Sequence, residues 1–160
     1  MSVTADSIMT NRFLRISTAH TLREAMGLIL YGEERNMDTG AIVVIDQEGD
    51  YAGILTPRYV VRGLSKTAAQ EHNLNAEGFV ESLENHLSDT IDTVMDKELP
   101  DLPRDASFAE IVRLISAQKY ECLPVVEEKR VVGLVYASDV FKTAANLALT
   151  PGQEGIALDR

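Results

Sequence analysis

The stretch that decides the fold is LPVVEEKRVVGLVYASD, residues 123–139. It contains two short apolar runs, Val125-Val126 and Val131–Val135, and β-branched residues in such runs favour buried strands over a helix. The four charged residues between the runs, Glu127–Arg130, are costly to bury and therefore form a solvated turn. Gly133 allows another segment to approach the backbone closely. The stretch predicts two strands joined by a turn, with a helix to follow.

The end of this stretch has the character of a helix start. Ser138 and Asp139 precede an apolar, Ala-rich run that continues to Leu149, and both residue types are favoured at helix N-termini. A helix start offers free N–H groups and a partial positive charge, so together with a carboxylate it can hold a sugar and its phosphate. A cap alone explains the same residues equally well, with Ser138 as the N-cap and Asp139 in the first turn.

A second copy of the pattern lies upstream, which establishes an internal repeat. Each copy opens on an acidic tetrapeptide, continues through a capping box and an amphipathic helix, and ends on a strand pair and another helix start. The matched segments are Asp6–Met9 with Asp92–Met95, Thr21–Glu24 with Ser107–Glu110, Ala41–Leu55 with Leu123–Val135, and Thr56–Tyr59 with Tyr136–Asp139. The chain therefore divides into repeat 1 (3–66), an inserted helical linker (67–88), repeat 2 (89–149) and a flexible tail (150–160). Within the linker, an Asn N-cap with a hydrophobic staple and an apolar stripe predict one helix, from Leu74, Asn75, Phe79, Val80, Leu83 and Leu87.

Composition narrows the function classes. A formal net charge of −10 opposes binding to nucleic acid, which needs a surplus of Lys and Arg. Because the chain has a single cysteine, Cys122, it forms no intrachain disulfide. The N-terminus lacks the apolar run of a signal peptide and no apolar run reaches membrane-spanning length, so we expect a soluble, cytoplasmic protein that does not bind membranes.

Catalytic and metal-binding patterns are missing from the sequence. No nucleophile–base set, glycine-rich phosphate loop or carboxylate pair stands at a recurring catalytic spacing, so we expect a protein that is not an enzyme. The three histidines, His20, His72 and His86, are scattered without ligand spacing, so we expect no metal site.

With both copies in view, the chain resembles a tandem pair of CBS domains, also called a Bateman module. The resemblance covers about residues 3–66 and 89–149 and rests on the openings DSIMT and DTVMD, on LPVV with its charged turn, and on GLVYASD. It implies an α/β fold of two βαββα repeats, packed sheet to sheet about a pseudo-twofold axis, with the extra helix between them. It also implies a homodimer, and we expect exposed apolar helix residues such as Val60, Val61 and Leu64 to contribute to its surface.

The resemblance also implies a ligand site. The family's signature is a Gly, a Ser or Thr three residues later, and an Asp three residues beyond, which hydrogen-bonds both ribose hydroxyls. In repeat 2 Gly133 and Asp139 match the signature, and Tyr136 replaces the hydroxyl residue. In repeat 1 Gly53 and Thr56 match, and Tyr59 replaces the acid. The hydroxyls and the helix start would meet phosphate, with Ser138 beside the acid in repeat 2 and Arg58 available to an anion in repeat 1. Residues before each Val-Val strand would line an adenine pocket, namely Tyr120, Cys122 and Leu123 in repeat 2 and Thr39, Ala41 and Ile42 in repeat 1.

Two side chains keep alternative interpretations. Tyr136 either packs in the core or stacks on a base, and Cys122 is either a small buried residue or a reactive thiol. Because some relatives carry a basic residue at the Cys122 position, its replacement disfavours strong binding of a triphosphate.

Three functions remain open at this point. The leading hypothesis is a regulatory module that binds an adenosine-containing nucleotide, AMP above all, in the cleft headed by Asp139 and signals to a partner protein. ADP, ATP, S-adenosylmethionine, NAD and cyclic dinucleotides also fit, since several of them present the same diol. The alternative is a ligand-free module for dimerisation or interaction, which the incomplete signatures favour, and an enzyme is the third hypothesis.

Overall fold

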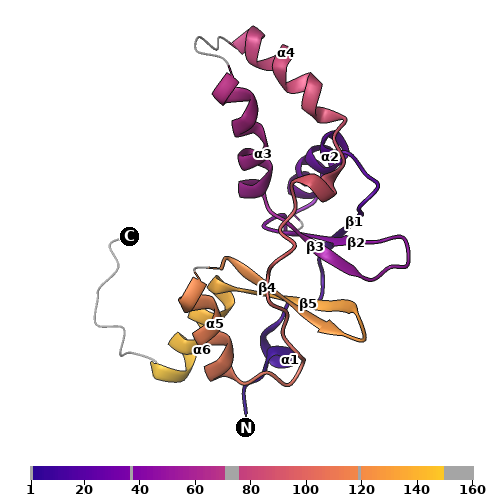
Figure 1. Ribbon diagram of the computed structural model, residues 1–160. Coiled ribbons are helices and arrows are strands. Elements are labelled where there is room, and N and C mark those ends of the chain that lie inside the picture. Colours follow the sequence, from indigo (N-terminus) through magenta and orange to yellow (C-terminus); the bar gives the residue numbers. More distant parts are fainter. Residues whose placement is uncertain (1, 37, 71–75, 119, 150–160) are drawn as a thin grey trace, which may run out of the picture.

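The computed structural model describes residues 2–36, 38–70, 76–118 and 120–149, with the backbone alone at 65–70, 76, 79 and 82 (Figure 1). The elements run in the order α1 (Ala5–Ile8), β1 (Leu14–Ser17), α2 (Leu22–Glu34), β2 (Ile42–Ile45), β3 (Tyr51–Leu55), α3 (Pro57–Gln70), α4 (Ala76–Leu87), a 3-10 turn (Ile91–Thr93), α5 (Phe108–Gln118), β4 (Cys122–Glu127), β5 (Arg130–Tyr136) and α6 (Ala137–Ala148). Expectations for Leu74, Asn75 and the tail 150–160 lie outside the described residues.

The predicted α/β fold is confirmed. In the first repeat β1 pairs in parallel with β2, which pairs antiparallel with β3. In the second repeat β4 and β5 form the predicted hairpin, with Leu123 opposite Val135 and Val125 opposite Gly133. The two residues between these strands, Glu128 and Lys129, have φ values of 50° and 68°. Two consecutive residues with positive φ make the tight turn whose twist suits an antiparallel hairpin.

Within its described residues, the second repeat lacks a full counterpart of β1. Only Leu102 takes that place, as a single parallel bridge to β4 in which its N–H donates to the carbonyl of Pro124 at 2.9 Å. The flanking Pro100 and Pro103 have no N–H to donate. These prolines limit the strand to one residue, so the second sheet has two strands where the repeat pattern predicts three.

The segment that opens each repeat pairs with the other repeat. The first arm (residues 4–10) pairs with the second repeat, where Thr10 and Leu134 bond reciprocally at 2.8 and 2.9 Å. The second arm (residues 90–96) pairs with the first repeat, where Asp96 and Ile54 bond at 2.8 and 3.0 Å. Each arm therefore lies against the other repeat, and the two bridges are related by the expected pseudo-twofold symmetry.

Buried apolar side chains follow this exchange. Ile91, from the second arm, is completely buried in the core of the first repeat beneath α2. Ala5, from the first arm, is completely buried in the core of the second repeat with Ile111 of α5. A third cluster, which includes Val43 and Leu134, joins the two sheets face to face. The arms and this central layer hold the repeats together as one unit.

Glycine is required where the arms cross the sheets. A Cβ added to Gly53 would lie 2.7 Å from the carbonyl oxygen of Asp96, and one added to Gly133 would lie 2.7 Å from Cγ of Met9. The close approach expected at Gly133 is confirmed, and the repeat explains why Gly53 has the same role.

The inserted helix is present as α4, and it lies beside α3 (Figure 1). α3 continues to Gln70, past the expected end of repeat 1 at residue 66. Leu87 of α4 is buried, whereas Val80 is 54% exposed and does not belong to a buried stripe. On α3, Val60 is buried and Leu64 packs against the same core, so these residues do not form an exposed surface. Val61 alone of that trio is well exposed.

Candidate functional site

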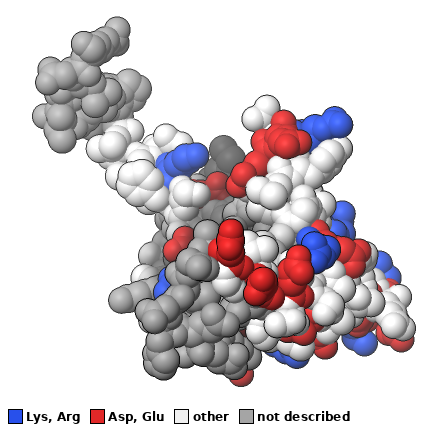
Figure 2. Space-filling view, turned by 90° about the horizontal axis from the view of Figure 1, so that it is seen from above, with Lys and Arg blue, Asp and Glu red and all other residues white. Residues whose placement is uncertain are grey.

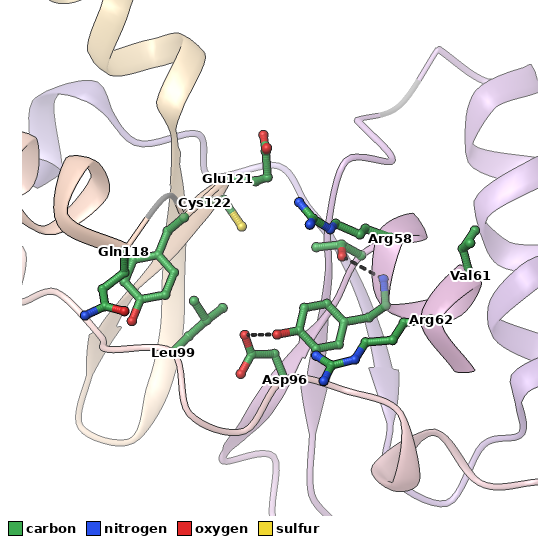
Figure 3. Close-up of a pocket in the computed structure, with 11 residues that line it drawn as sticks. Arg58, Val61, Arg62, Asp96, Leu99, Gln118, Glu121 and Cys122 are labelled. Carbon is green, nitrogen blue, oxygen red and sulfur yellow. Dashed lines mark hydrogen bonds between the residues drawn. The ribbon is translucent and has the colours of Figure 1, made fainter. Parts of the chain in front are cut away.

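A cavity of about 700 Å³ lies between the two repeats. We call it the open cleft. Its walls come from the start of α3, the second arm and the loop that enters β4, and Figure 3 shows these walls facing one another. The lining residues are Thr56, Arg58, Tyr59, Val61, Arg62, Asp96, Leu99, Gln118, Tyr120, Glu121 and Cys122.

The wall formed by α3 is basic and begins at a helix N-terminus. Pro57 takes the first helical position, where a missing N–H costs nothing. Thr56 precedes it, and its Oγ1 accepts the N–H of Tyr59 at 3.3 Å. Arg58 and Arg62 stand one turn apart and both reach the cavity. The positive end of the helix dipole and the guanidinium groups together suit an anion, above all a phosphate.

A tyrosine and a carboxylate meet on the neighbouring wall. The Tyr59 hydroxyl donates to Oδ2 of Asp96 at 2.7 Å (Figure 3). Partial burial and this hydrogen bond raise the pKa of Tyr59. Oδ1 of Asp96 accepts the N–H of Glu98 at 2.9 Å. Asp96 is therefore held at both ends, by its backbone bridge to Ile54 and by its carboxylate, while it still faces the cavity.

The opposite wall is more apolar. Leu99, Tyr120 and Cys122 lie there, and Cys122 is only 2% exposed. Burial, with the nearby Asp38, raises the pKa of the Cys122 thiol to about 12. The thiol is therefore protonated at neutral pH, and Cys122 acts as a small buried side chain rather than a nucleophile.

The structure groups the predicted residues differently from the sequence. The repeat pattern assigns Tyr120 and Cys122 to the same site as Asp139, because all three belong to repeat 2. In the structure they line the cavity with Thr56 and Arg58 of repeat 1. The cleft crosses between repeats because the sheets pack face to face, which is a tertiary feature that a single repeat does not encode.

At the symmetry-related position, which carries Asp139, the ring of Tyr136 packs against the first repeat. The ring of Tyr136 lies against Gly40, since a Cβ added there would be 3.2 Å from Cε1 of the tyrosine. Burial, followed by the carboxylate of Asp38, raises the pKa of Tyr136. The buried hydroxyl makes no well-formed hydrogen bond, although Asp38 lies near it. The ring of Tyr136 packs against the protein here, and its stacking on a base stays a prediction.

Asp139 caps its own helix. Its Oδ2 accepts the N–H of Tyr136 at 3.1 Å, and Tyr136 is the N-cap residue of α6. The expectation of Ser138 as the N-cap is wrong, because the N-cap is Tyr136 and α6 begins two residues earlier than expected, at Ala137. Ser138 is exposed in the first turn.

The remaining predicted residues lie outside the lining of the open cleft. Ile42 is completely buried in the core of the first repeat, and Leu123 is completely buried in the core of the second. Thr39 is half-buried beside Gly40, on the side of Tyr136. None of the three is among the residues that line the open cleft.

Sequence reasoning missed several lining residues, above all Asp96 and Tyr59. The repeat does carry a signal, since Asp96 is the counterpart of Thr10 when the copies are aligned on Asp6 and Asp92. The signal is incomplete because nothing in the sequence indicates that the arms exchange. Once the exchange is known, Asp96 falls beside the signature of repeat 1.

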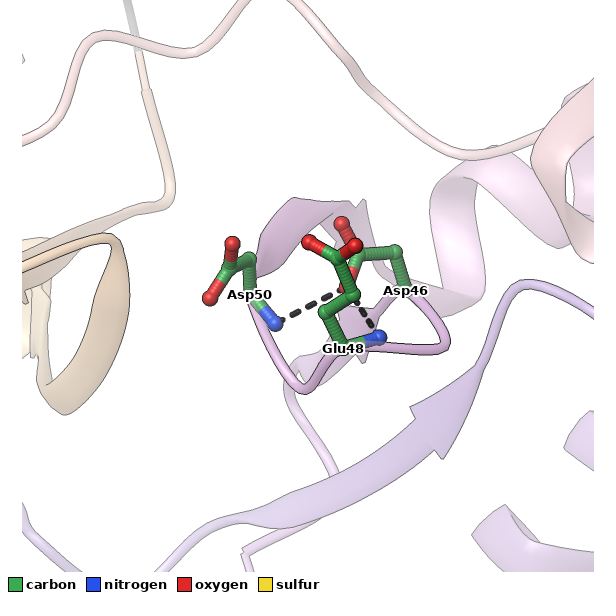
Figure 4. Close-up of side chains that lie close together, drawn as sticks. All are labelled: Asp46, Glu48 and Asp50. Atoms are coloured by element: carbon green, nitrogen blue, oxygen red, sulfur yellow. Dashed lines mark hydrogen bonds between the residues drawn. The ribbon is translucent and has the colours of Figure 1, made fainter.

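One cluster of carboxylates lies outside the cleft. Asp46, Glu48 and Asp50 come together in the turn between β2 and β3 (Figure 4). Oδ1 of Asp46 accepts the N–H groups of Glu48 and Asp50 at 2.8 and 3.0 Å. An aspartate that binds the backbone two residues on is an ordinary turn device, which accounts for this cluster.

Comparison with known proteins agrees with the fold. The family model described as CBS domain matches residues 5–66 and 91–146. The uncharacterized protein MJ1404 of Methanocaldococcus jannaschii is 26% identical over 140 residues, which are 88% of this chain and 31% of that protein. The chain thus spans about a third of the length of this curated relative.

Solved structures show the same architecture. The CBS domain pair of protein MJ0100, in complex with 5′-methylthioadenosine and S-adenosyl-L-methionine, has a TM-score of 0.68 and 17% identity, over 92% of this chain and 99% of that one. The cytosolic domain of the Mg²⁺ channel MgtE, in complex with ATP, has a TM-score of 0.66 and 20% identity, over 88% of this chain and 48% of that one. Within the described residues, no helix has both the length and the hydropathy needed to cross a membrane. The chain belongs to the CBS domain family and carries two copies of the domain.

Proposed function

We propose that this protein is a regulatory module that binds an adenosine-containing nucleotide, with AMP favoured, in the open cleft. The observation that carries the proposal is a cavity of about 700 Å³ that joins a basic helix start of one repeat to an apolar wall of the other. Small-molecule sites usually have volumes of about 300–1,000 Å³ and a few convergent polar groups. The adenosine complexes of the structural neighbours support the same ligand class.

The phosphate would bind at α3. Thr56 offers a hydroxyl, Arg58 a guanidinium, and the start of α3 the positive end of the helix dipole. These groups stabilise negative charge together, because the helix dipole and the arginine act at the same place. A single phosphate matches this short basic wall, since Glu121 and Asp96 make the rest of the cavity acidic.

The adenine would lie against the opposite wall. Leu99, Tyr120 and Cys122 provide apolar and aromatic surface there. A neutral thiol at position 122 does not repel the base, and a tyrosine can stack on it. The ligand would then touch both repeats at once.

A ligand that bridges the repeats can regulate a partner. Nucleotide contacts on α3 and on the β4 entry would favour one relative arrangement of the repeats over others. A regulated protein, still to be identified, would distinguish the two arrangements. The acidic surface supports a protein partner and not a nucleic acid, because the net charge is −10 and acidic side chains gather near the middle of the face seen in Figure 2.

A thermal-shift panel tests the proposal. The protein would be heated with AMP, ADP, ATP, S-adenosylmethionine, NAD and cyclic dinucleotides, each in excess. A ligand at about 100 times its dissociation constant stabilises the folded state by about 2.7 kcal/mol. For a chain of this size the melting temperature rises by roughly 5–10 °C. We expect that shift with AMP, and a flat panel at millimolar ligand would overturn the proposal.

Paired arginine variants assign the shift to the open cleft. Arg58→Gln removes the guanidinium at the helix start and should abolish most of the AMP shift. Arg113→Gln, an exposed arginine of α5 away from the cavity, is the matched control and should keep it. Equal shifts in both variants would contradict a phosphate site at α3.

A ligand-free interaction module is the second candidate. The packing of the Tyr136 ring against Gly40, and the use of Asp139 as a helix cap, favour it. This candidate predicts a dimer whose stability is the same with every nucleotide in the panel. Turnover of a nucleotide, lost on mutation of a cleft residue, would instead point to an enzyme.

A further inference from the structure

The two ligand positions of this protein carry the same pair of chemical groups in exchanged places. Each position is formed by the end of one repeat's signature and by the arm that crosses to that repeat. In the open cleft these are Tyr59 and Asp96, which share a hydrogen bond, and their counterparts in the repeat are Asp139 and Thr10, the latter bridged to Leu134. Each pair therefore has one carboxylate and one hydroxyl. The carboxylate lies on the arm in the open cleft (Asp96) and on the helix in the other pair (Asp139).

We propose that Asp96, supplied by the second arm, is the group that recognises the ribose diol in the open cleft. This inference rests on the proposed function and deepens it, because it names the residue that selects a ribonucleotide over a deoxyribonucleotide.

The geometry makes Asp96 suitable for this role. Its backbone is fixed by reciprocal bonds to Ile54 at 2.8 and 3.0 Å, with Gly53 directly beneath. Its carboxylate is oriented by the Tyr59 hydroxyl at 2.7 Å and the Glu98 N–H at 2.9 Å. An ionised carboxylate has about four acceptor sites, so two remain for the two ribose hydroxyls. A rigid, partly satisfied acceptor loses little entropy when it binds a diol.

Other groups of the cleft are less suitable. Thr56 already accepts a backbone N–H and stands at the helix start with Arg58, where the phosphate would bind. Glu121 is exposed and stands next to Cys122 on the wall assigned to the base. Asp96 lies between the two walls, which is where the sugar of a bound nucleotide must be.

Calorimetric titration with AMP and 2′-deoxy-AMP tests the inference. The wild-type protein should bind AMP at least about tenfold more tightly, because a hydrogen bond to a charged group is lost with the deoxy sugar. Asp96→Asn should bind both ligands with nearly equal affinity. Tyr59→Phe should keep the preference, since the carboxylate remains. Asp139→Asn, at the other position, is the matched control and should also keep it.

An exchange variant keeps the test decisive if Asp96→Asn is too unstable to titrate. Tyr59→Asp combined with Asp96→Thr reproduces in the open cleft the pair found at the other position, and it should retain the preference for AMP. A preference that survives Asp96→Asn would overturn the ribose role of Asp96 and leave the nucleotide site intact. No binding of AMP by the wild-type protein would overturn both proposals.

Discussion

Two glycines show how single residues hold the repeats together. A Cβ at Gly53 would meet a backbone oxygen, that of Asp96, at 2.7 Å, whereas a Cβ at Gly133 would meet the Met9 side chain. We expect Gly53→Ala to cost about 1–3 kcal/mol, as overpacked sites do. Gly133→Ala should cost less, because a methionine side chain can move. Urea unfolding measures both.

Gly27 of α2 provides the control for these variants. A Cβ added there meets nothing within 4 Å, so Gly27→Ala should be neutral or should stabilise the helix by up to about 1 kcal/mol. A smaller loss for Gly53→Ala than for Gly133→Ala would contradict the close crossing of the second arm.

The buried thiol of Cys122 and the buried hydroxyls of Tyr51 and Tyr136 predict a loss of folding stability at high pH. Burial raises the pKa of Cys122 from 9.0 to about 12. The unfolded thiol therefore loses its proton above about pH 9 while the folded thiol retains it, so stability is full below pH 9 and falls as pH rises toward 12. Burial also raises the pKa of Tyr51 and of Tyr136, which extends the loss above pH 10. The urea midpoint should fall from pH 9 upward.

A pair of tyrosine variants isolates the contribution of Tyr136 to the loss of stability at high pH. Tyr136→Phe removes a buried hydroxyl whose pKa is raised, so it should lessen the fall in urea midpoint above pH 10. Tyr31→Phe removes an exposed hydroxyl of α2 and should not change that fall. Equal pH profiles for Tyr136→Phe and the wild-type protein would show that Tyr136 titrates normally.

At the scale of elements, the exchanged arms make a distinct prediction. Ile91 belongs to repeat 2 in sequence but is completely buried in the core of the first repeat. Ile91→Ala should cost about 2–5 kcal/mol, because it leaves a cavity there. Hydrogen exchange should then accelerate in α2 and β1–β3 more than in α5, β4 and β5. Faster exchange confined to the second repeat would contradict the exchange of arms.

The elements also show what the sequence can and cannot predict. The hairpin around Glu127–Arg130 and the capping boxes at Thr21 and Ser107 depend on neighbouring residues, so local pattern was sufficient to predict them. The strand predicted around Leu102 is missing because of its flanking prolines. The symmetry of the repeat predicts a strand there, whereas the prolines argue against one. The start of α6 was misplaced by two residues, because Asp139 serves as the N3 partner of Tyr136 and not as an N-cap neighbour.

The site was only partly predictable for a related reason. Thr56, Arg58, Tyr120 and Cys122, which the sequence offers as ligand-binding candidates, line the cavity together, and their binding role stays a prediction. The grouping of these residues depends on how the two sheets pack together. The place of Asp96 depends on how the second arm crosses to the first repeat. Neither feature can be deduced from neighbouring residues in the sequence. The ring of Tyr136 packs against Gly40, a contact between residues far apart in sequence.

At the scale of the whole molecule, we propose a homodimer formed through exposed helix residues. Phe141 and Leu147 of α6 are 71% and 64% exposed, and such apolar surface is costly to leave in water. Light scattering should give the mass of a dimer. Phe141→Glu should shift the protein toward monomer, and Val80→Glu on α4 should not. A monomeric wild-type protein at high concentration would contradict the dimer.

The central claim is that one nucleotide binds per chain, in the open cleft and not at Asp139. Calorimetric titration with AMP tests it most directly, because it gives both the affinity and the number of sites. We predict one site per chain, with affinity strongly reduced in Arg58→Gln and unchanged in Asp139→Asn. Two sites per chain, or a loss of binding in Asp139→Asn with Arg58→Gln unaffected, would contradict this account.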